Sequence, residues 1–109
     1  MDLHVQQQEL KDVYQFKVIG EVDAFTAPKL KEQLNTITHL KGVQAEIDVS
    51  EVAYMDSTGL GVFVGFYKTL QEQGGHVKVT GLNRRLYRLF EITGLDAIID
   101  VEEAEGDEQ

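Results

Sequence analysis

Three polar residues in a row, Asp56-Ser57-Thr58, are the part of this chain best suited to chemistry. They stand between the apolar Met55 and a hydrophobic run that contains several glycines. A carboxylate or hydroxyl in such a place caps a helix, because it accepts hydrogen bonds from the first free backbone N–H groups. One residue is enough for that cap. The other two are either redundant or available to another molecule.

The Ser57 hydroxyl is a good place to carry a phosphate group. The start of a helix favours an anion by about 0.3–2 kcal/mol, because the helix dipole and the free N–H groups attract it. Phosphorylation there should leave the fold intact while adding roughly −1.5 to −2 charges. A docking partner would lose a few kcal/mol to that uncompensated charge. Since 1.4 kcal/mol is about tenfold in affinity, the charge suffices for an on/off switch.

Three glycines follow within the same predicted helix, and each costs roughly 0.5–1 kcal/mol relative to alanine. Gly61 and Gly65 are four residues apart. We expect this pair to let the helix pack closely against a sheet. Gly59 lies in the first turn, where it predicts instead that something approaches the backbone.

Other kinds of chemistry find little support in the sequence. A hydrolase elbow needs glycine two residues before the serine, and Met55 stands there. The chain has neither a phosphate-binding GxxxxGK[ST] loop nor the glycine spacing of a dinucleotide site. Cysteine is absent, and His4, His39 and His76 stand in unrelated contexts. We therefore expect no enzyme activity, no cofactor and no metal.

Length and charge set further limits. The chain has 109 residues, of which 42% are apolar, so we expect one domain with a real core. The first residues lack a signal peptide and no apolar stretch could span a bilayer, which predicts a soluble, cytoplasmic protein. The net charge is −9, which disfavours direct contact with nucleic acid. A membrane contact is not expected either.

The acidic residues are concentrated at one end of the chain. Five of them lie in residues 102–109, so the body carries only −4 of the −9 charges. We expect a domain over residues 1–101 and a disordered acidic tail over residues 102–109. A small basic cluster, formed by Arg84, Arg85 and Arg88, is most simply the solvent face of a helix.

Period-two alternation with β-branched residues predicts strands over residues 13–20, 43–49 and 76–80. LHVQQQE near the start is a weaker strand, and residues 98–101 could form a short last one. Strands that are covered on both faces are apolar throughout, whereas these strands alternate between apolar and polar residues. We therefore expect helices on one face of the sheet and water on the other.

Helical spacing of apolar residues separates these strands. One predicted helix starts at Thr26, which could cap it, and runs through Ile37; another covers residues 57–73, and a third covers residues 83–94. The order is β-β-α-β-α-β-α, with the short last strand left open. Strands linked through helices pair in parallel. The predicted class is α/β, with a four- to five-stranded mixed sheet and helices packed mainly on one face.

Three motifs resemble a known family. Asp56-Ser57-Thr58-Gly59-Leu60-Gly61 resembles the signature of the anti-sigma factor antagonists, a bacterial STAS-domain family. Gly20-Glu21-Val22-Asp23 with Ala27-Pro28 is similar to its first-loop motif, and residues 88–95 are similar to its last helix. The motifs occur in the family's order and cover nearly the whole chain except the acidic tail. The local sequence is most similar to the general stress-response anti-anti-sigma factor of Gram-positive bacteria.

The resemblance implies a partner-switching mechanism. The unphosphorylated antagonist binds an anti-sigma factor that is also a serine protein kinase, and this binding releases the sigma factor to RNA polymerase. The kinase then phosphorylates the serine that matches Ser57, and the complex dissociates. A PP2C-type serine phosphatase reverses the modification.

The resemblance also assigns roles to individual residues. Asp23 matches an acidic position on the kinase-facing surface, Thr58 is expected to be a contact rather than the acceptor, and Asp56 is expected to cap the helix. The predicted partner-binding residues are Asp23, Asp56, Ser57, Thr58, Gly59 and Gly61. An alternative is a STAS interaction module that acts as a scaffold or ligand sensor in a stress-signalling complex. A nucleotide-binding or hydrolysing enzyme has no sequence support.

Overall fold

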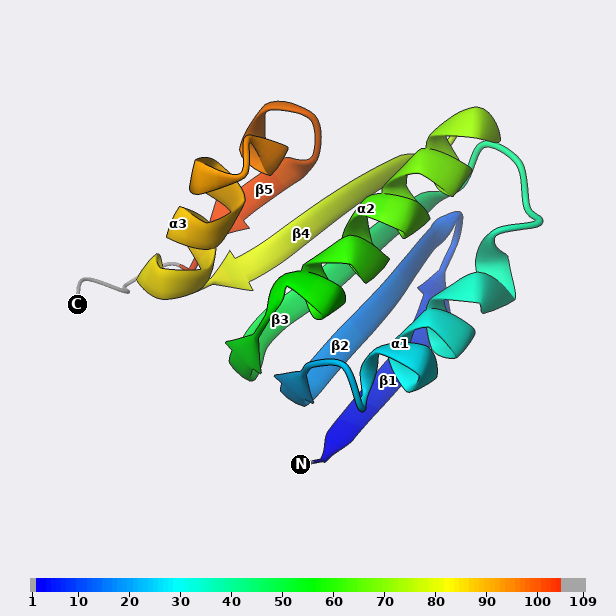
Figure 1. The fold of residues 1–109 in the computed structure, drawn as a ribbon. Helices are drawn as coiled ribbons and strands as arrows, with labels where there is room; N and C mark the ends of the chain where they lie inside the picture. The colour runs from blue at the N-terminus through cyan, green and yellow to red at the C-terminus, as the bar shows by residue number, and fades with distance from the viewer. Residues whose placement is uncertain (1, 105–109) are drawn as a thin grey trace.

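A computed structural model describes residues 2–104 of the chain (Figure 1). Within these residues no helix is long and apolar enough to cross a membrane. The elements are, in chain order, β1 Leu3–Leu10, β2 Val13–Val22, α1 Ala27–Leu34, a 3₁₀ turn Asn35–Ile37, β3 Gln44–Met55, α2 Ser57–Glu72, β4 His76–Leu82, α3 Arg84–Ile92, a 3₁₀ turn Leu95–Ala97 and β5 Asp100–Glu103.

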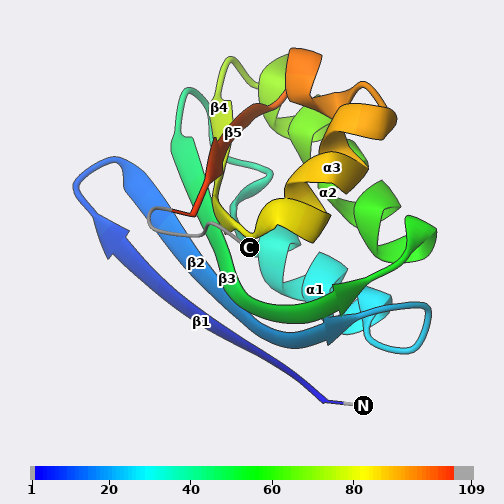
Figure 2. The same cartoon turned by 90° about the vertical axis from the view of Figure 1, so that its left-hand side faces the viewer.

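The strands form one sheet in the order β1-β2-β3-β4-β5. β1 runs antiparallel to β2, and every later pair is parallel. The helices all lie against one face of this sheet, while the other face is open (Figures 1 and 2). The predicted mixed sheet with one-sided helices is confirmed, and the short last strand exists.

The core fills the space between the helices and the sheet. Alternate residues of the inner strands are fully buried there, among them Phe16, Ile47 and Val79. Two edge-to-face aromatic pairs hold α2: Phe66 packs on Phe16 of the sheet at 6.3 Å, and Phe63 packs on Phe90 of α3 at 6.2 Å between ring centroids. The helix predicted over residues 57–73 is thus fixed by side chains that point from α2 onto the sheet and onto α3.

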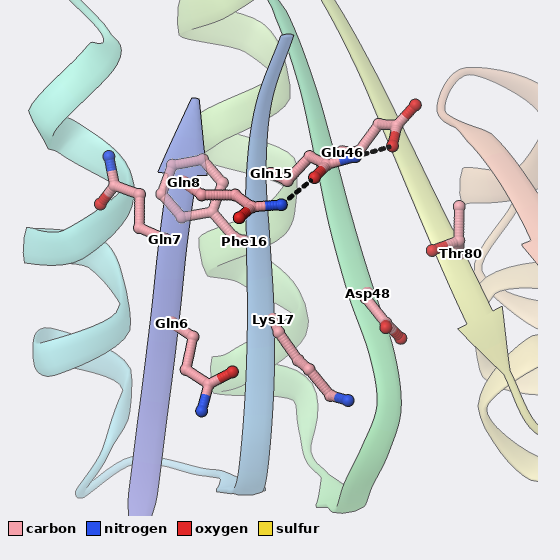
Figure 3. A pocket seen from close by; sticks show the side chains of 9 residues that line it. All are labelled: Gln6, Gln7, Gln8, Gln15, Phe16, Lys17, Glu46, Asp48 and Thr80. Atoms are coloured by element: carbon pink, nitrogen blue, oxygen red, sulfur yellow. Dashed lines mark hydrogen bonds between the residues drawn. The ribbon is translucent and has the colours of Figure 1, made fainter. Parts of the chain in front are cut away.

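The open face of the sheet is polar, as the alternation predicted. Gln8 donates to Gln15 at 2.7 Å and Gln15 donates to Glu46 at 3.3 Å (Figure 3). Lys17 pairs with Glu51 at 3.0 Å, and this hydrogen bond raises the pKa of the lysine. A shallow hollow of about 370 Å³ lies among these side chains. Its lining is polar except for Phe16, and it includes no residue of the Asp56-Ser57-Thr58 segment.

β3 is longer than the predicted strand, which ended at residue 49. It continues to Met55, but its buried residues there are spaced by three, at Val49, Val52 and Met55. The pairing of β2 with β3 shifts register at two points in this stretch. A bulge breaks the period of two, so alternation alone could not reveal the strand's true end.

The end of the chain differs from the predicted boundary at residue 101. β5 runs through Glu102 to Glu103, which pair with Thr80 and Leu82 of β4. The first two residues of the predicted disordered tail therefore belong to the sheet. The Ala104 amide also donates to the Leu82 carbonyl at 2.7 Å, and residues 105–109 lie outside the described residues.

Candidate functional site

The Asp56-Ser57-Thr58 segment lies where the inner strands end. β2 and β3 run parallel and finish side by side, with Val22 opposite Met55. The Asp56 amide donates to the Val22 carbonyl at 3.1 Å, which joins the start of α2 to the end of β2. We call residues 22–26 and 55–61 the carboxyl edge. The fold thus brings Asp23 and the segment 56–61 together, as a binding surface would require.

Asp56 alone caps α2. Its backbone is extended, and its Oδ1 accepts from the Gly59 amide at 3.0 Å. Ser57 and Thr58 occupy the first two helical positions and are exposed. Within residues 2–104 neither of their hydroxyls makes a hydrogen bond. The two hydroxyls are therefore free to meet another molecule.

Gly59 is needed by the fold itself. A Cβ added to this residue would lie 2.6 Å from the Val22 carbonyl oxygen, and closer still to the Val22 side chain. The sequence predicted that something approaches the backbone at Gly59. The approaching group is Val22 of β2 in the same chain. Gly59 therefore allows α2 to start close against the end of β2.

Gly61 and Gly65 do not pack against the sheet, and that expectation was wrong. Both residues are exposed, and a Cβ added to either would meet nothing within 4 Å. The side chains that α2 turns toward the sheet are instead larger ones, such as Phe63 and Phe66. The two glycines line a groove of about 560 Å³ between α1 and α2, beside Thr58.

The loop between β2 and α1 is held by Asp23 and Thr26. Asp23 Oδ1 accepts from the Phe25 amide at 2.9 Å and from the Thr26 amide at 3.0 Å. The Thr26 hydroxyl accepts from the Asp23 amide at 2.9 Å and donates to the Glu21 carbonyl at 2.7 Å. Thr26 was predicted to cap the following helix, but its buried hydroxyl makes no cap bond. The Asp23 carboxylate instead holds two amides of the turn that precedes the helix, and the amide of the first helical residue, Ala27, donates to the Asp23 carbonyl at 2.8 Å.

The sequence did not lead us to predict an exposed aromatic residue at this edge, Phe25. Phe25 is 88% exposed, at the tip of the loop between Asp23 and Thr26. Tyr54, near the end of β3, is 51% exposed. The available signal was an aromatic residue inside a turn of polar and small residues, which the period-two and helical patterns do not cover.

The chain thus combines a five-stranded sheet, helices on one face and a polar-capped helix at the carboxyl edge. The STAS family model matches residues 4–108, so the chain belongs to this family. It is 52% identical over 90 residues to a Listeria monocytogenes protein named anti-sigma-B factor antagonist, which covers 83% of this chain and 79% of that protein. The Bacillus subtilis protein of the same name is 44% identical over 101 residues, or 93% and 92% of the two chains.

A solved structure supports the fold independently. The crystal structure of an anti-sigma factor antagonist from Mycobacterium paratuberculosis superposes with a TM-score of 0.85. It covers 97% of this chain and 90% of its own, at 24% sequence identity. The family resemblance read from the three sequence motifs is confirmed.

Proposed function

We propose that this chain is an anti-sigma factor antagonist, which in its unphosphorylated form binds an anti-sigma factor and so releases a sigma factor. The observation that carries the proposal is Ser57: an exposed hydroxyl with no bond within residues 2–104, next to a cap that does not use it. The chain's similarity to proteins named anti-sigma-B factor antagonist supports the choice of partner.

The binding surface is the carboxyl edge. Ser57 and Thr58 offer their hydroxyls there, and Gly61 leaves the adjoining turn of α2 bare. The carboxylates of Asp23 and Asp56 accept hydrogen bonds from backbone amides, and Val22 packs against Gly59. We assign Ser57, Thr58 and Gly61 to the contact with the partner. Asp23, Asp56 and Gly59 hold the surface in shape.

Phosphorylation of Ser57 switches the binding off. The anti-sigma factor acts as a serine kinase: Ser57 Oγ bonds to the γ-phosphorus of ATP, ADP leaves, and the hydroxyl proton is lost. A PP2C-type phosphatase hydrolyses the ester and restores the hydroxyl. In this cycle the chain is a substrate and a ligand rather than an enzyme, and it uses no cofactor.

The physical basis of the switch lies in the helix start. The Asp56 carboxylate accepts from the Gly59 amide. The amides of Ser57 and Thr58, at the first two helical positions, are available to an anion. The helix therefore accepts a phosphate, but a partner seated on the edge would have to cover roughly two negative charges beside Asp56. An uncompensated buried charge costs several kcal/mol, which is enough to dissociate the complex.

The proposed partners place the action of this chain in the cytoplasm, since sigma factors work on RNA polymerase. A net charge of −9 disfavours a direct role on nucleic acid or on anionic membranes. The specificity for transcription is therefore assigned to the protein partner.

The test is a pull-down from host lysate with wild type, Ser57→Asp and Ser57→Asn, followed by mass spectrometry. Asn matches Asp in size but lacks its charge, so it separates charge from shape. Wild type and Ser57→Asn should retain an ATPase-fold anti-sigma factor, and Ser57→Asp should not, with melting temperatures within about 2 °C of each other. Ser57→Ala should bind constitutively and take up no phosphate from ATP. Equal retention by all variants would refute the switch.

A further inference from the structure

Phe25 is the most exposed large apolar side chain in the described part of the molecule, at 88% of its surface. Fully burying a phenylalanine side chain is worth about 1.5–3 kcal/mol. The fold obtains almost none of that, because the ring projects from the β2–α1 loop into solvent. The other large exposed apolar residues are Leu10, Tyr54, Ile92 and Ile98, at 48–73%.

The backbone that carries this ring is well fixed. The Phe25 amide donates to Asp23 Oδ1 at 2.9 Å, and the same oxygen holds the Thr26 amide. The Ala27 amide donates to the Asp23 carbonyl at 2.8 Å, and the buried Thr26 hydroxyl ties the loop to Glu21. A side chain presented by an ordered loop loses little conformational entropy on binding.

Phe25 and Ser57 rise from the same edge. Val22 contacts both the Asp56 amide and the Gly59 backbone, and Phe25 follows it by three residues. Three residues span at most about 11 Å. An interface of ordinary size around Ser57, roughly 800 Å² on each partner, is therefore wide enough to include Phe25.

We propose that Phe25 is the apolar anchor of this chain, and that it inserts into an apolar pocket on the anti-sigma factor, rimmed by basic side chains. The inference rests on the proposed function. The apolar pocket follows from the ring, and the basic rim from two carboxylates of the carboxyl edge: Asp23, which accepts from the Phe25 amide, and Asp56, whose amide donates to Val22. Asp23 is then a positioning residue: it acts on the partner through the loop that it holds.

An anchor at this place also sharpens the phosphate switch. Anchor residues sit in desolvated pockets, surrounded by contacts that exclude water. When Phe25 occupies its pocket, Ser57 lies within the part of the interface from which water is excluded. A phosphate on Ser57 then loses its hydration on binding, which raises its penalty well above that of a solvated surface charge.

The experiment titrates the purified host anti-sigma factor with wild type, Phe25→Ala and Phe25→Tyr by isothermal calorimetry. Phe25→Ala should weaken binding at least about thirty-fold, the loss typical of a hot spot, with an unchanged melting temperature. Phe25→Tyr keeps the ring and should bind within about fivefold of wild type. Ile92→Ala is the matched control, because Ile92 is also exposed, at 73%, but lies at the end of α3. It should bind as wild type does.

The outcomes separate this inference from the function on which it rests. Tight binding by wild type and equally by Phe25→Ala would overturn the anchor and leave the function standing. An anti-sigma factor that does not bind wild type would overturn both. A wild-type dimer in sedimentation that becomes monomeric in Phe25→Ala would overturn the inference too, since the ring would then seat on a second copy of the chain.

Discussion

Replacing Gly61 with alanine should stabilise the fold and weaken the complex. Gly61 is an exposed residue inside a 16-residue helix, and an added Cβ meets nothing within 4 Å. The substitution removes the helix penalty of glycine, which is about 0.5–1 kcal/mol. For a domain of this size, that gain raises the melting temperature by about 2–6 °C.

The same methyl group faces the proposed partner. A surface that fits closely against bare backbone tolerates an extra methyl poorly, at a typical cost of about 1–3 kcal/mol. This corresponds to an affinity loss of roughly five- to 150-fold. Stability and binding should therefore move in opposite directions.

Gly59→Ala and Gly65→Ala are the matched controls. At Gly59 the new Cβ would lie 2.6 Å from the Val22 carbonyl oxygen, so we expect a net loss of roughly 0.5–2 kcal/mol. At Gly65 the space is open, and four residues place it about 6 Å further from Ser57. It should gain stability as Gly61→Ala does, with an affinity within about threefold of wild type.

Urea unfolding followed by circular dichroism measures the stability, and calorimetric titration of the anti-sigma factor measures the affinity. A less stable Gly61→Ala would refute the reasoning from open space around that residue. A more stable Gly61→Ala that binds as tightly as wild type would remove Gly61 from the contact surface. Equal affinity losses at Gly61 and Gly65 would mean that the partner fills the groove along α2.

Two carboxylates of the carboxyl edge give further tests of its construction. Asp56→Ala removes the cap of α2 and should cost about 1 kcal/mol in urea unfolding, while Asp56→Ser should retain most of that stability, because a serine hydroxyl can also accept from the Gly59 amide. Asp23→Ala leaves two loop amides without their acceptor and should lose about 1–2 kcal/mol together with partner affinity. Asp23→Asn keeps the accepting oxygen and should bind within about threefold of wild type, and a large loss there would show that the partner reads the charge itself.

The layered architecture could be predicted from the sequence because it depends on short-range periods. Residues 13–20 and 76–80 alternate regularly, and the long helix from Ser57 repeats its apolar residues at helical spacing. Each of these features is encoded within one element or in the order of elements. Asp23 was expected beside Ser57 only through the family resemblance, and the parallel pairing of β2 with β3, whose ends lie side by side, gives the structural reason for their shared edge.

The roles of the glycines could not be predicted in this way. Whether a glycine in α2 is needed depends on how the helix is rotated over the sheet and on what lies opposite each residue. Val22, which closes on Gly59, is 37 positions earlier in the chain. Similarly, the nearest hydroxyl to the start of α1 belongs to Thr26, but a turn precedes the helix, and the hydroxyl is engaged there by the Asp23 amide and the Glu21 carbonyl. Both errors concern contacts whose distances are set only by the packed structure.

The separate roles of Asp56 and Ser57 at the carboxyl edge explain how the proposed phosphorylation of one hydroxyl would act as a switch without a change of fold. Asp56 caps α2, so the hydroxyl of Ser57 takes no part in holding the helix. If Ser57 were itself the cap, phosphorylation would replace the capping hydroxyl by a bulkier, charged group, and the hydrogen bonds at the helix start would have to rearrange around it. Because the cap and the proposed phosphate acceptor are adjacent but separate residues, we expect phosphorylation to change the charge of the edge and to leave its shape. The partner alone then distinguishes the two forms, and the affinity difference is set by desolvation of the phosphate in the interface.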